Sequence, residues 1–413
     1  MRTRRRGLLQ FIVLYTALYA AFGLVSPFLP IFLSERGFGP EQLGILLGLG
    51  TALRTISGPV TGHLADRFHA FKPQLSAAAL LSGILTFMYV PAGGLWTLAA
   101  VSLLGAVTLA PLVPLADGLT LACARPADGR RGFEYGWVRG AGSAAFIAGV
   151  LGAGQIAAAH GLSAVIVSSA GCLAVTSLLV LSVPERPKPE AKAASDRTAH
   201  EWRTLFRPSS FLWVTLVAGL VLGSHAMHDS FAVIRWTAAG VSAGTSSLLW
   251  SESVAAEVVV FVLIGPTMLR AFGPAAALTI AALAGAVRWI VMAQTADVAA
   301  LLSIEPLHGL SFALLHLACM RVIVDAVPAA LAGTAQTVYG LLGVGGATAL
   351  MTAFSGWLYG RFGAEGFWAM ALLCVLALPV IWLLRMSLRA RVHAAPEAPP
   401  ALDRSPQRRT SFD

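Results

Sequence analysis

The amino-acid sequence predicts an all-α membrane protein with twelve transmembrane helices arranged in two six-helix bundles. Hydrophobic residues make up 57% of the chain and charged residues only 12%, whereas a soluble domain carries roughly 25% charged residues. Apolar runs near the length of about 20 residues that a helix needs to cross a bilayer recur along the whole chain. A charged, proline-rich stretch divides these runs into six and six.

Each predicted span lies between polar or glycine-rich turns. The spans are 8–33, 41–65, 73–90, 95–123, 133–159, 162–183, 209–236, 244–269, 274–293, 298–323, 329–359 and 366–386.

These spans define the expected domains. Residues 1–183 would form the first bundle, 184–208 a cytoplasmic linker, 209–388 the second bundle and 389–413 a disordered cytoplasmic tail. The linker is rich in proline and charge, a composition that cannot form a core. Two halves joined in this way suit a secondary transporter, because a site near the midplane is then exposed alternately as the halves rock.

The distribution of charge predicts the topology and excludes one class of partner. The formal net charge is +9, which in a soluble protein would suggest nucleic acid. Here the lysines and arginines lie mainly in alternate loops and at both ends, which is the positive-inside pattern. We therefore expect no nucleic-acid binding, a multi-pass protein of the inner (plasma) membrane, and both termini in the cytoplasm.

A motif follows the second predicted span. It reads Gly62-His63-Leu64-Ala65-Asp66-Arg67. Gly62 permits a close helix approach, Asp66 can accept hydrogen bonds from a neighbouring helix end, and Arg67 can reach a carboxylate or phosphate. The pattern is similar to the cytoplasmic gate motif of the major facilitator superfamily, and this resemblance implies the major facilitator fold.

Asp117 and Arg139 lie inside predicted spans of the first half, as does Arg54 in the second span. Asp117 is roughly six residues, about 9 Å, from the cytoplasmic end of its span, and Arg139 lies at a similar depth in the next. Antiparallel neighbours would bring them level, and an embedded pair costs far less than two isolated charges. A structural pair and a site for a substrate carboxylate both remain open.

The second half carries more embedded charge. Glu305 and His308 are three residues apart, so they share a helix face, and Arg288 lies in the preceding span. A histidine beside a carboxylate and opposite an arginine fits a proton relay, because histidine titrates nearest neutral pH. A static hydrogen-bonded trio is the alternative.

Three further embedded residues complete the candidate set. His225 and Asp229 are four residues apart and share a face of their span. They have the spacing of two metal ligands, but no further ligands converge on them, so no metal site is predicted. Glu257 is embedded in the next span.

Two resemblances narrow the function. Phe133-Glu134-Tyr135-Gly136 followed by Arg139 resembles the start of helix five in lactose permease, which implies that Arg139 contacts substrate and pairs with Asp117. Arg288 and His308 fall at the spacing of that permease's helix-nine arginine and helix-ten histidine.

A closer likeness covers nearly the whole chain and is to the phenylpropionate permease branch of the superfamily. The segments that carry it are Pro114-Leu115-Ala116-Asp117, Tyr135-Gly136-Trp137-Val138-Arg139, Ser224-His225-Ala226, Leu248-Leu249-Trp250, Ala256-Glu257, Arg288-Trp289 and Leu307-His308-Gly309-Leu310. The branch is regarded as proton symporters for aromatic acids. The sequence departs from its pattern at Asp229, where an aromatic residue is usual, at Glu305, where an amide is usual, and at Ser311, which replaces threonine.

The leading functional hypothesis is proton-coupled uptake of a small organic (aromatic) acid, driven by a proton gradient and without a cofactor. The expected residues are Arg139, Asp117, Arg288, His225 and Tyr19 for substrate binding, Glu257, Glu305, His308 and Asp229 for proton coupling, and Gly62, Asp66 and Arg67 for gating. We expect a monomer whose partners are a small-molecule substrate and the lipid bilayer.

Four alternatives stand beside this hypothesis. The same fold would serve a proton-coupled sugar or nucleoside symporter, or an exporter of amphipathic compounds. A membrane enzyme is disfavoured, because no nucleophile or metal set gathers near a membrane face. A non-transporting sensor would be expected to carry a larger soluble domain.

Overall fold

The structure, a computed structural model, is mainly helical over the residues it describes, which are 2–68, 70–124, 132–184, 209–328 and 331–394. The first half contains α1 (Arg2–Val25), α2 (Leu29–Glu35), α3 (Pro40–Phe68), α4 (Phe71–Met88), α5 (Leu95–Leu109), α6 (Leu112–Ala124), α7 (Tyr135–His160) and α8 (Leu162–Ser182). The second half contains the α-helices α10 (Ser209–Gly223), α11 (Ala226–Ala238), α12 (Ala243–Val259), α13 (Gly265–Gln294), α14 (Val298–Ile304), α15 (Leu315–Ala326), α16 (Ala332–Val338), α17 (Ala347–Phe362) and α18 (Phe367–Ala394).

The second half also contains tighter and wider helical turns. Three π-helical turns, η1 (Val260–Ile264), η3 (Gly309–Leu314) and η5 (Tyr339–Gly346), continue directly into or out of α-helices. Two 3₁₀ turns, η2 (Glu305–Leu307) and η6 (Gly363–Gly366), are also found among the described residues of this half. Wide turns of this kind occur mainly as single bulges and often at functional sites. The sequence did not predict them.

Nine helical segments among the described residues are long and apolar enough to cross a bilayer. Two of these, 243–294 and 332–390, contain 52 and 59 residues, which is more than twice the length of a single crossing. The first turns back at Gly273, whose φ of 75° suits glycine, and Pro274 then starts the returning helix. The predicted count of twelve spans stays a prediction.

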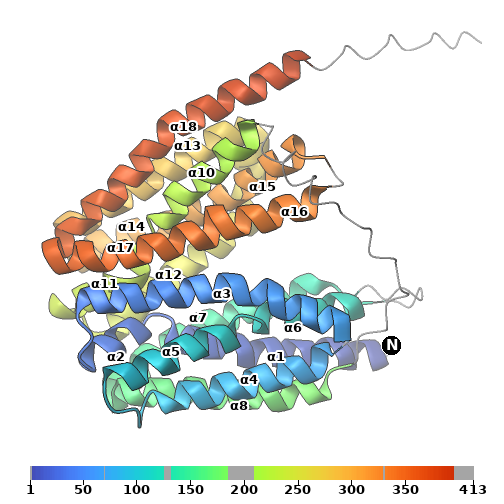
Figure 1. Cartoon of the computed structure of the whole chain (residues 1–413), viewed down its shortest axis with the longest axis vertical. Helices are drawn as coiled ribbons and strands as arrows, with labels where there is room; N and C mark the ends of the chain where they lie inside the picture. Colours follow the sequence, from blue (N-terminus) through green and yellow to red (C-terminus); the bar gives the residue numbers. More distant parts are fainter. Residues whose placement is uncertain (1, 69, 125–131, 185–208, 329–330, 395–413) are drawn as a thin grey trace, which may run out of the picture.

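Helices of the two halves occupy separate regions of the molecule (Figure 1). Helices α1–α8 pack mainly on one another, as do α10–α18. The two groups meet along α3 with α17 and along α7 with α12. Residues 185–208, most of the predicted linker, lie outside the described residues. Helix α18 continues to Ala394; residues 395–413 lie outside the described residues, so the predicted tail stays a prediction.

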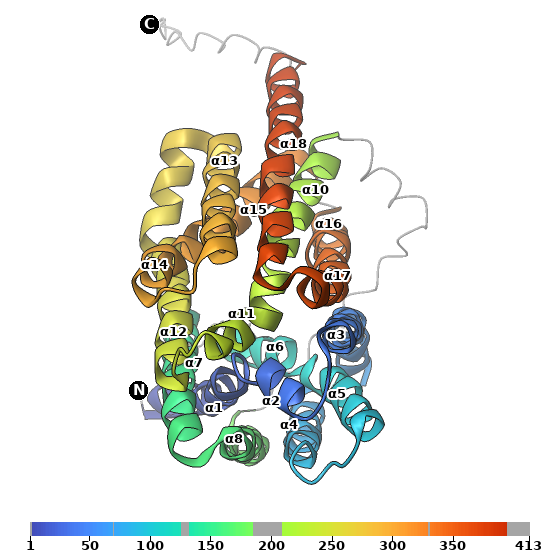
Figure 2. The same ribbon diagram turned by 90° about the vertical axis from the view of Figure 1, so that its left-hand side faces the viewer.

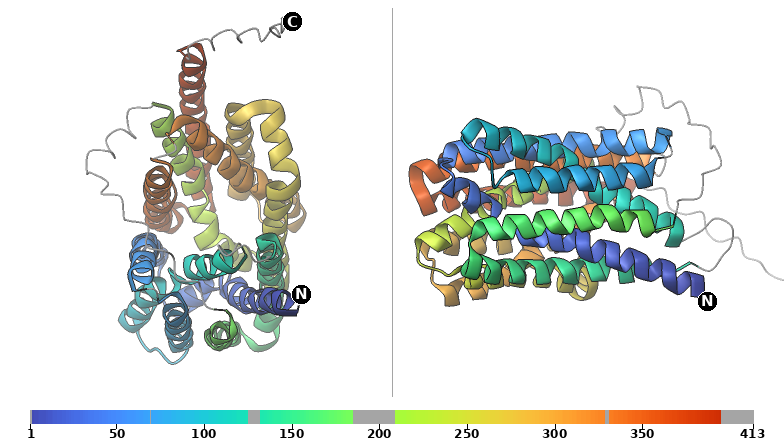
Figure 3. Two further views of the ribbon diagram at one scale, coloured as in Figure 1. Left: turned by 90° about the vertical axis from the view of Figure 1, so that its right-hand side faces the viewer. Right: turned by 90° about the horizontal axis from the view of Figure 1, so that it is seen from below.

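Glycines bring the two halves into contact at one end of the molecule, which we term the closed end (Figure 3, right panel, left side). A Cβ placed on Gly44 of α3 would lie 2.5 Å from the Cα of Gly356 on α17. A Cβ on Gly154 of α7 would lie 2.8 Å from the carbonyl oxygen of Ala243, at the start of α12. We term these two contacts, α3 with α17 and α7 with α12, the glycine seams. Both require glycine, because small residues alone let helix backbones approach this closely.

At the opposite end, which contains the amino terminus, the halves are less tightly packed. A Cβ on Gly62 of α3 would meet no atom within 4 Å. Arg67 is exposed, and its guanidinium lies 5.8 Å from the centre of the Phe68 ring. The side chain of Asp66, the third residue of the predicted gate, lies outside the described residues. The gate motif thus makes no close glycine contact in this structure.

Candidate functional site

Arg139 and Tyr19, both predicted to bind substrate, lie together between α7 and α1. The guanidinium of Arg139 donates to the hydroxyl of Tyr19 and lies 5.0 Å from the centre of its ring. The ring of Tyr19 stacks on Tyr15 at 5.7 Å and meets the edge of Phe22 at 5.9 Å. Arg139 itself is exposed. The arrangement presents a cation beside a cluster of three aromatic rings.

Asp117 is held by tyrosines rather than by Arg139. The hydroxyls of Tyr15 and Tyr135 donate to its Oδ1 at 2.5 and 2.7 Å. No ion pair joins it to Arg139 within the described part of the chain, so the expected Asp117–Arg139 pair is not formed here. Counting residues from the end of each span predicts how deep Asp117 and Arg139 lie in the membrane, but not which side chains surround them. Hydrogen bonds from two donors compensate the half-buried carboxylate, and Arg139 is left to contact Tyr19.

Arg288 and Glu305 form a fully buried ion pair in the second half. Their side chains are both 0% exposed, and Arg288 Nη2 lies 2.7 Å from Glu305 Oε2. The Ser253 hydroxyl on α12 donates to the same carboxylate oxygen. Arg288 was expected to bind a substrate carboxylate, but in this structure Glu305 already occupies its guanidinium.

His308 connects this pair to Glu257. Arg288 Nη1 donates to His308 Nδ1 at 3.2 Å. Because a guanidinium has no acceptor, Nδ1 must carry the lone pair, and the ring proton is on Nε2. Nε2 faces Glu257 Oε2 at 3.6 Å. Arg288 therefore contacts both Glu305 and His308, and Glu257 extends the group.

On the other side of Glu305 lies His228, a residue that the sequence reasoning missed. Its Nε2 is 3.4 Å from Glu305 Oε1, and its Nδ1 is 3.2 Å from Asp229 Oδ1. His228 is 3% exposed and Asp229 is 54% exposed. A signal was available, because His228 is a second intramembrane histidine three residues after His225 and adjacent to an embedded acid.

Six ionisable residues are thus connected in one series of contacts. The series runs Glu257, His308, Arg288, Glu305, His228, Asp229. Five were predicted as site residues from separate local patterns, and the structure joins them. The two ends of the series are the partly and largely exposed carboxylates, and its centre is buried.

His225 belongs to a neighbouring neutral network. Its Nδ1 lies 2.9 Å from the carbonyl of Val221, so that nitrogen must be the donor, and Ser311 then donates to its Nε2 at 3.0 Å. Its ring lies 5.3 Å from that of His308. His225 and Asp229 do not share a ligand, and no group of three or more metal-binding side chains gathers among the described residues.

The two halves are also linked electrostatically. Glu257 on α12 lies within electrostatic range of Arg139 on α7 and of His316 on α15. His316 lines a cavity of about 770 Å³ between α3 and the segments α15, α16 and η5. That cavity is bounded by residues of both halves, and His316 in its wall interacts electrostatically with Glu257.

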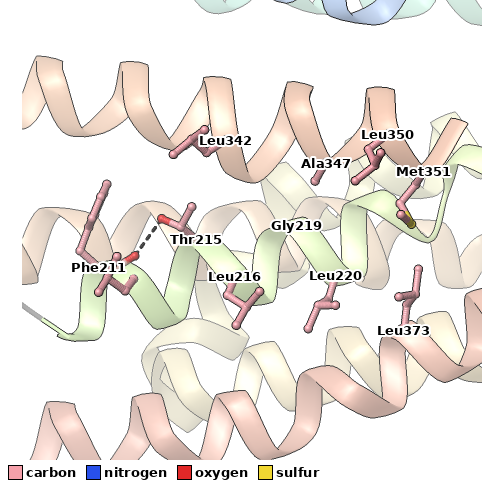
Figure 4. A pocket seen from close by; sticks show the side chains of 11 residues that line it. Phe211, Thr215, Leu216, Gly219, Leu220, Leu342, Ala347, Leu350, Met351 and Leu373 are labelled. Atoms are coloured by element: carbon pink, nitrogen blue, oxygen red, sulfur yellow. Dashed lines mark hydrogen bonds between the residues drawn. The ribbon is translucent and has the colours of Figure 1, made fainter. Parts of the chain in front are cut away.

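A second cavity, of about 360 Å³, lies between α10, α17 and α18 and is different in character (Figure 4). Its walls are almost entirely apolar, with Leu216, Leu220 and Leu350 among them, and the Thr215 hydroxyl is directed at the Phe211 carbonyl at 2.8 Å. It offers no charge to a solute and is not a candidate for the site.

Comparison with known proteins agrees with this architecture. Residues 8–370 match the model of the MFS_1 like family. The chain belongs to this family of the major facilitator superfamily. It is 33% identical over 384 residues, covering 89% of this chain and 95% of the relative, to the "Probable 3-phenylpropionic acid transporter" of Escherichia coli strain K12. It is 23% identical to the maltose permease of Geobacillus stearothermophilus, covering 92% and 95% of the two chains.

Solved structures show the same fold. The crystal structure of the nucleoside transporter NupG superposes with a TM-score of 0.75 at 15% identity, over 92% of this chain and 99% of that one. The predicted fold class and family are confirmed. The protein is a multi-pass membrane transporter of the major facilitator type.

Proposed function

We propose that the protein is a proton-coupled carrier that imports a small aromatic carboxylic acid by alternating access. The observation that carries the proposal is the exposed guanidinium of Arg139 beside the rings of Tyr15, Tyr19 and Phe22. A guanidinium fork suits a carboxylate, and aromatic rings stack on one another at these distances. The name of the relative from Escherichia coli supports an arylpropionate.

The binding step follows from the charges. A substrate carboxylate would take the guanidinium of Arg139, which in the present structure faces Tyr19 and lies in range of Glu257. Glu257 would then lose part of its compensating charge, which favours uptake of a proton by the series that it begins. Substrate and proton would thus bind together, as symport requires.

Alternating access would use the glycine seams. We propose that the closed end faces the outside and that both termini are cytoplasmic, so that the structure is inward-facing. The tight approach of Gly44 to Gly356 supports a sealed outer end, and the open surroundings of Gly62 support an unsealed inner end. In the opposite state the contacts would exchange, with the gate motif 62–67 closing.

The test is uptake of labelled 3-phenylpropionate into proteoliposomes with an imposed pH gradient, inside alkaline. We expect accumulation that needs the gradient, and its loss in Arg139→Ala. Arg321→Ala is the matched control, because that arginine pairs with Asp325 on an exposed surface and lies outside the site. Equal uptake with and without the gradient would remove the coupling to protons.

The same assay addresses the other substrates. Competition by unlabelled nucleoside or maltose, with no competition by aromatic acids, would replace the organic-acid assignment with a nucleoside or sugar. Accumulation only under the reversed gradient would replace import with export.

A further inference from the structure

We propose that His228 is the residue that carries the coupled proton between the buried Glu305 and the exposed Asp229. The inference rests on the proposed proton-coupled function and names the path that the proton takes. It starts from the contacts of the imidazole, whose two nitrogens face two different carboxylates at 3.4 and 3.2 Å.

The burial of the three groups gives the path a direction. Glu305 is 0% exposed, so its carboxylate exchanges protons through a neighbouring side chain. Asp229 is 54% exposed although it lies within a transmembrane segment. His228, at 3% exposure, separates the two carboxylates. A proton on Glu305 therefore reaches solvent through the imidazole and then through Asp229.

The two atoms that face each other between Glu305 and His228 are not hydrogen-bonded in this structure. Oε2 of Glu305 is bonded to Arg288 and Ser253. Its other oxygen, Oε1, and the facing Nε2 of His228 are both buried and without a hydrogen bond. An unsatisfied buried polar atom costs about 1–3 kcal/mol. The two atoms face each other at 3.4 Å, so a proton on either one would complete the missing hydrogen bond.

Aromatic side chains fix the ring in its place. The imidazole stacks on Trp250 at 5.0 Å with an angle of 26°. Trp236 and Trp289 lie against it at 5.8 Å each. The ring cannot turn to present one nitrogen to both acids, so protons must enter at one nitrogen and leave from the other.

The transfer balances without any further reactant. A protonated Glu305 gives its Oε1 proton to His228 Nε2, while the proton on Nδ1 passes to Asp229 Oδ1. One O–H and one N–H bond break, and one N–H and one O–H bond form. Asp229 then releases its proton to water. Loading follows the same path in reverse, which restores the original tautomer without rotation of the ring.

Other charged groups set the background for this transfer. Arg288 on α13 and Glu252 on α12 interact electrostatically with Glu305, and His308 at the end of η2 interacts with His228. Arg288 stays paired with Glu305 in the described conformation and has no proton to give. His308 is bound to Arg288 through the nitrogen that lacks a proton and so lies outside the path.

The experiment compares two modes of transport in proteoliposomes with labelled 3-phenylpropionate as the probe. Exchange of labelled for unlabelled probe needs no net proton movement, whereas accumulation under a pH gradient does. His228→Gln keeps the size and polarity of the side chain but cannot carry a proton between the acids. We expect accumulation to slow by about 100-fold, within the range of lost acid–base transfers, while exchange stays near the wild-type rate.

The controls separate the possible failures. His160→Gln, at the exposed end of α7, should accumulate and exchange like the wild type. Asp229→Asn, at an exposed position, should likewise slow accumulation while exchange stays near the wild-type rate. It tests the relay even where His228→Gln does not fold. Proton movement driven by the probe, followed with a pH dye in the vesicles, should disappear in both variants.

Normal gradient-driven accumulation in His228→Gln, or equal loss of exchange and accumulation in a folded variant, would overturn the relay. A wild type that exchanges the probe but never responds to the gradient would instead overturn the proposed coupling itself.

Discussion

Removing Arg288 should destabilise the protein by an amount that depends on pH. In Arg288→Met the carboxylate of Glu305 stays buried at 0% exposure without its partner at 2.7 Å, and breaking a buried pair in this way costs about 3–5 kcal/mol. The carboxyl can escape that penalty by taking up a proton. Near neutral pH this costs an ordinary glutamate, with an unperturbed pKa of about 4.3, roughly 4 kcal/mol.

The free-energy cost of breaking the pair and that of protonating Glu305 agree, so proton uptake by Glu305 sets how much stability the variant loses. Because the folded variant then holds a proton that the unfolded chain lacks above about pH 4.3, its deficit grows with rising pH by about 1.4 kcal/mol per unit. At about pH 5 it should fall to about 1 kcal/mol. Replacing both residues, in Arg288→Met with Glu305→Met, removes the buried charge and should recover most of the stability.

The assay is denaturant unfolding in mixed micelles, followed by tryptophan fluorescence, at several pH values. Arg321→Met serves as the control, because its pair with Asp325 has side chains 61% and 45% exposed and should contribute no more than about 0.5 kcal/mol. A deficit for Arg288→Met that is equally large at low and neutral pH, or a double variant no better than the single one, would refute the reasoning.

Four other outcomes follow from the site and the seams. Gly44→Leu should abolish uptake without loss of membrane insertion, because its side chain would hold α3 away from α17; Gly171→Leu, with nothing within 4 Å, should transport normally. Asp117→Asn keeps an accepting Oδ1 but removes the charge, so it should lower stability by about 1 kcal/mol per bond, the difference between charge-assisted and neutral hydrogen bonds, in the same unfolding assay; unchanged stability would contradict the role of its two tyrosine donors. Arg139→Lys should weaken probe binding by about tenfold or more, since a lysine lacks the planar fork; equal affinity would show that charge alone suffices. Accumulation should respond to a pH gradient but not to a membrane potential.

Much of this arrangement could be predicted from the sequence, because a charged residue inside an apolar span is costly and therefore indicates a site. Depth and helix periodicity were enough to place Glu305 and His308 on one face near Arg288. They were not enough for Asp117, since depth does not say which hydroxyls a neighbouring helix will present. His228 was missed because its partner Glu305 belongs to a distant span, and only tertiary packing brings the two together.

The insensitivity to membrane potential follows from counting charge within the carrier. A carboxylate substrate brings one negative charge, and the proton that we place on the series returns one positive charge. The loaded and empty carriers then differ by no net charge, so reorientation moves none across the bilayer. A single uncompensated charge would couple to the potential by about 2.3 kcal/mol per 100 mV, or about 50-fold in accumulation. A potassium diffusion potential set with valinomycin, at equal pH on both sides, measures this directly. Accumulation of the probe under that potential alone would mean that more than one proton accompanies each substrate, and the series would then have to hold a second.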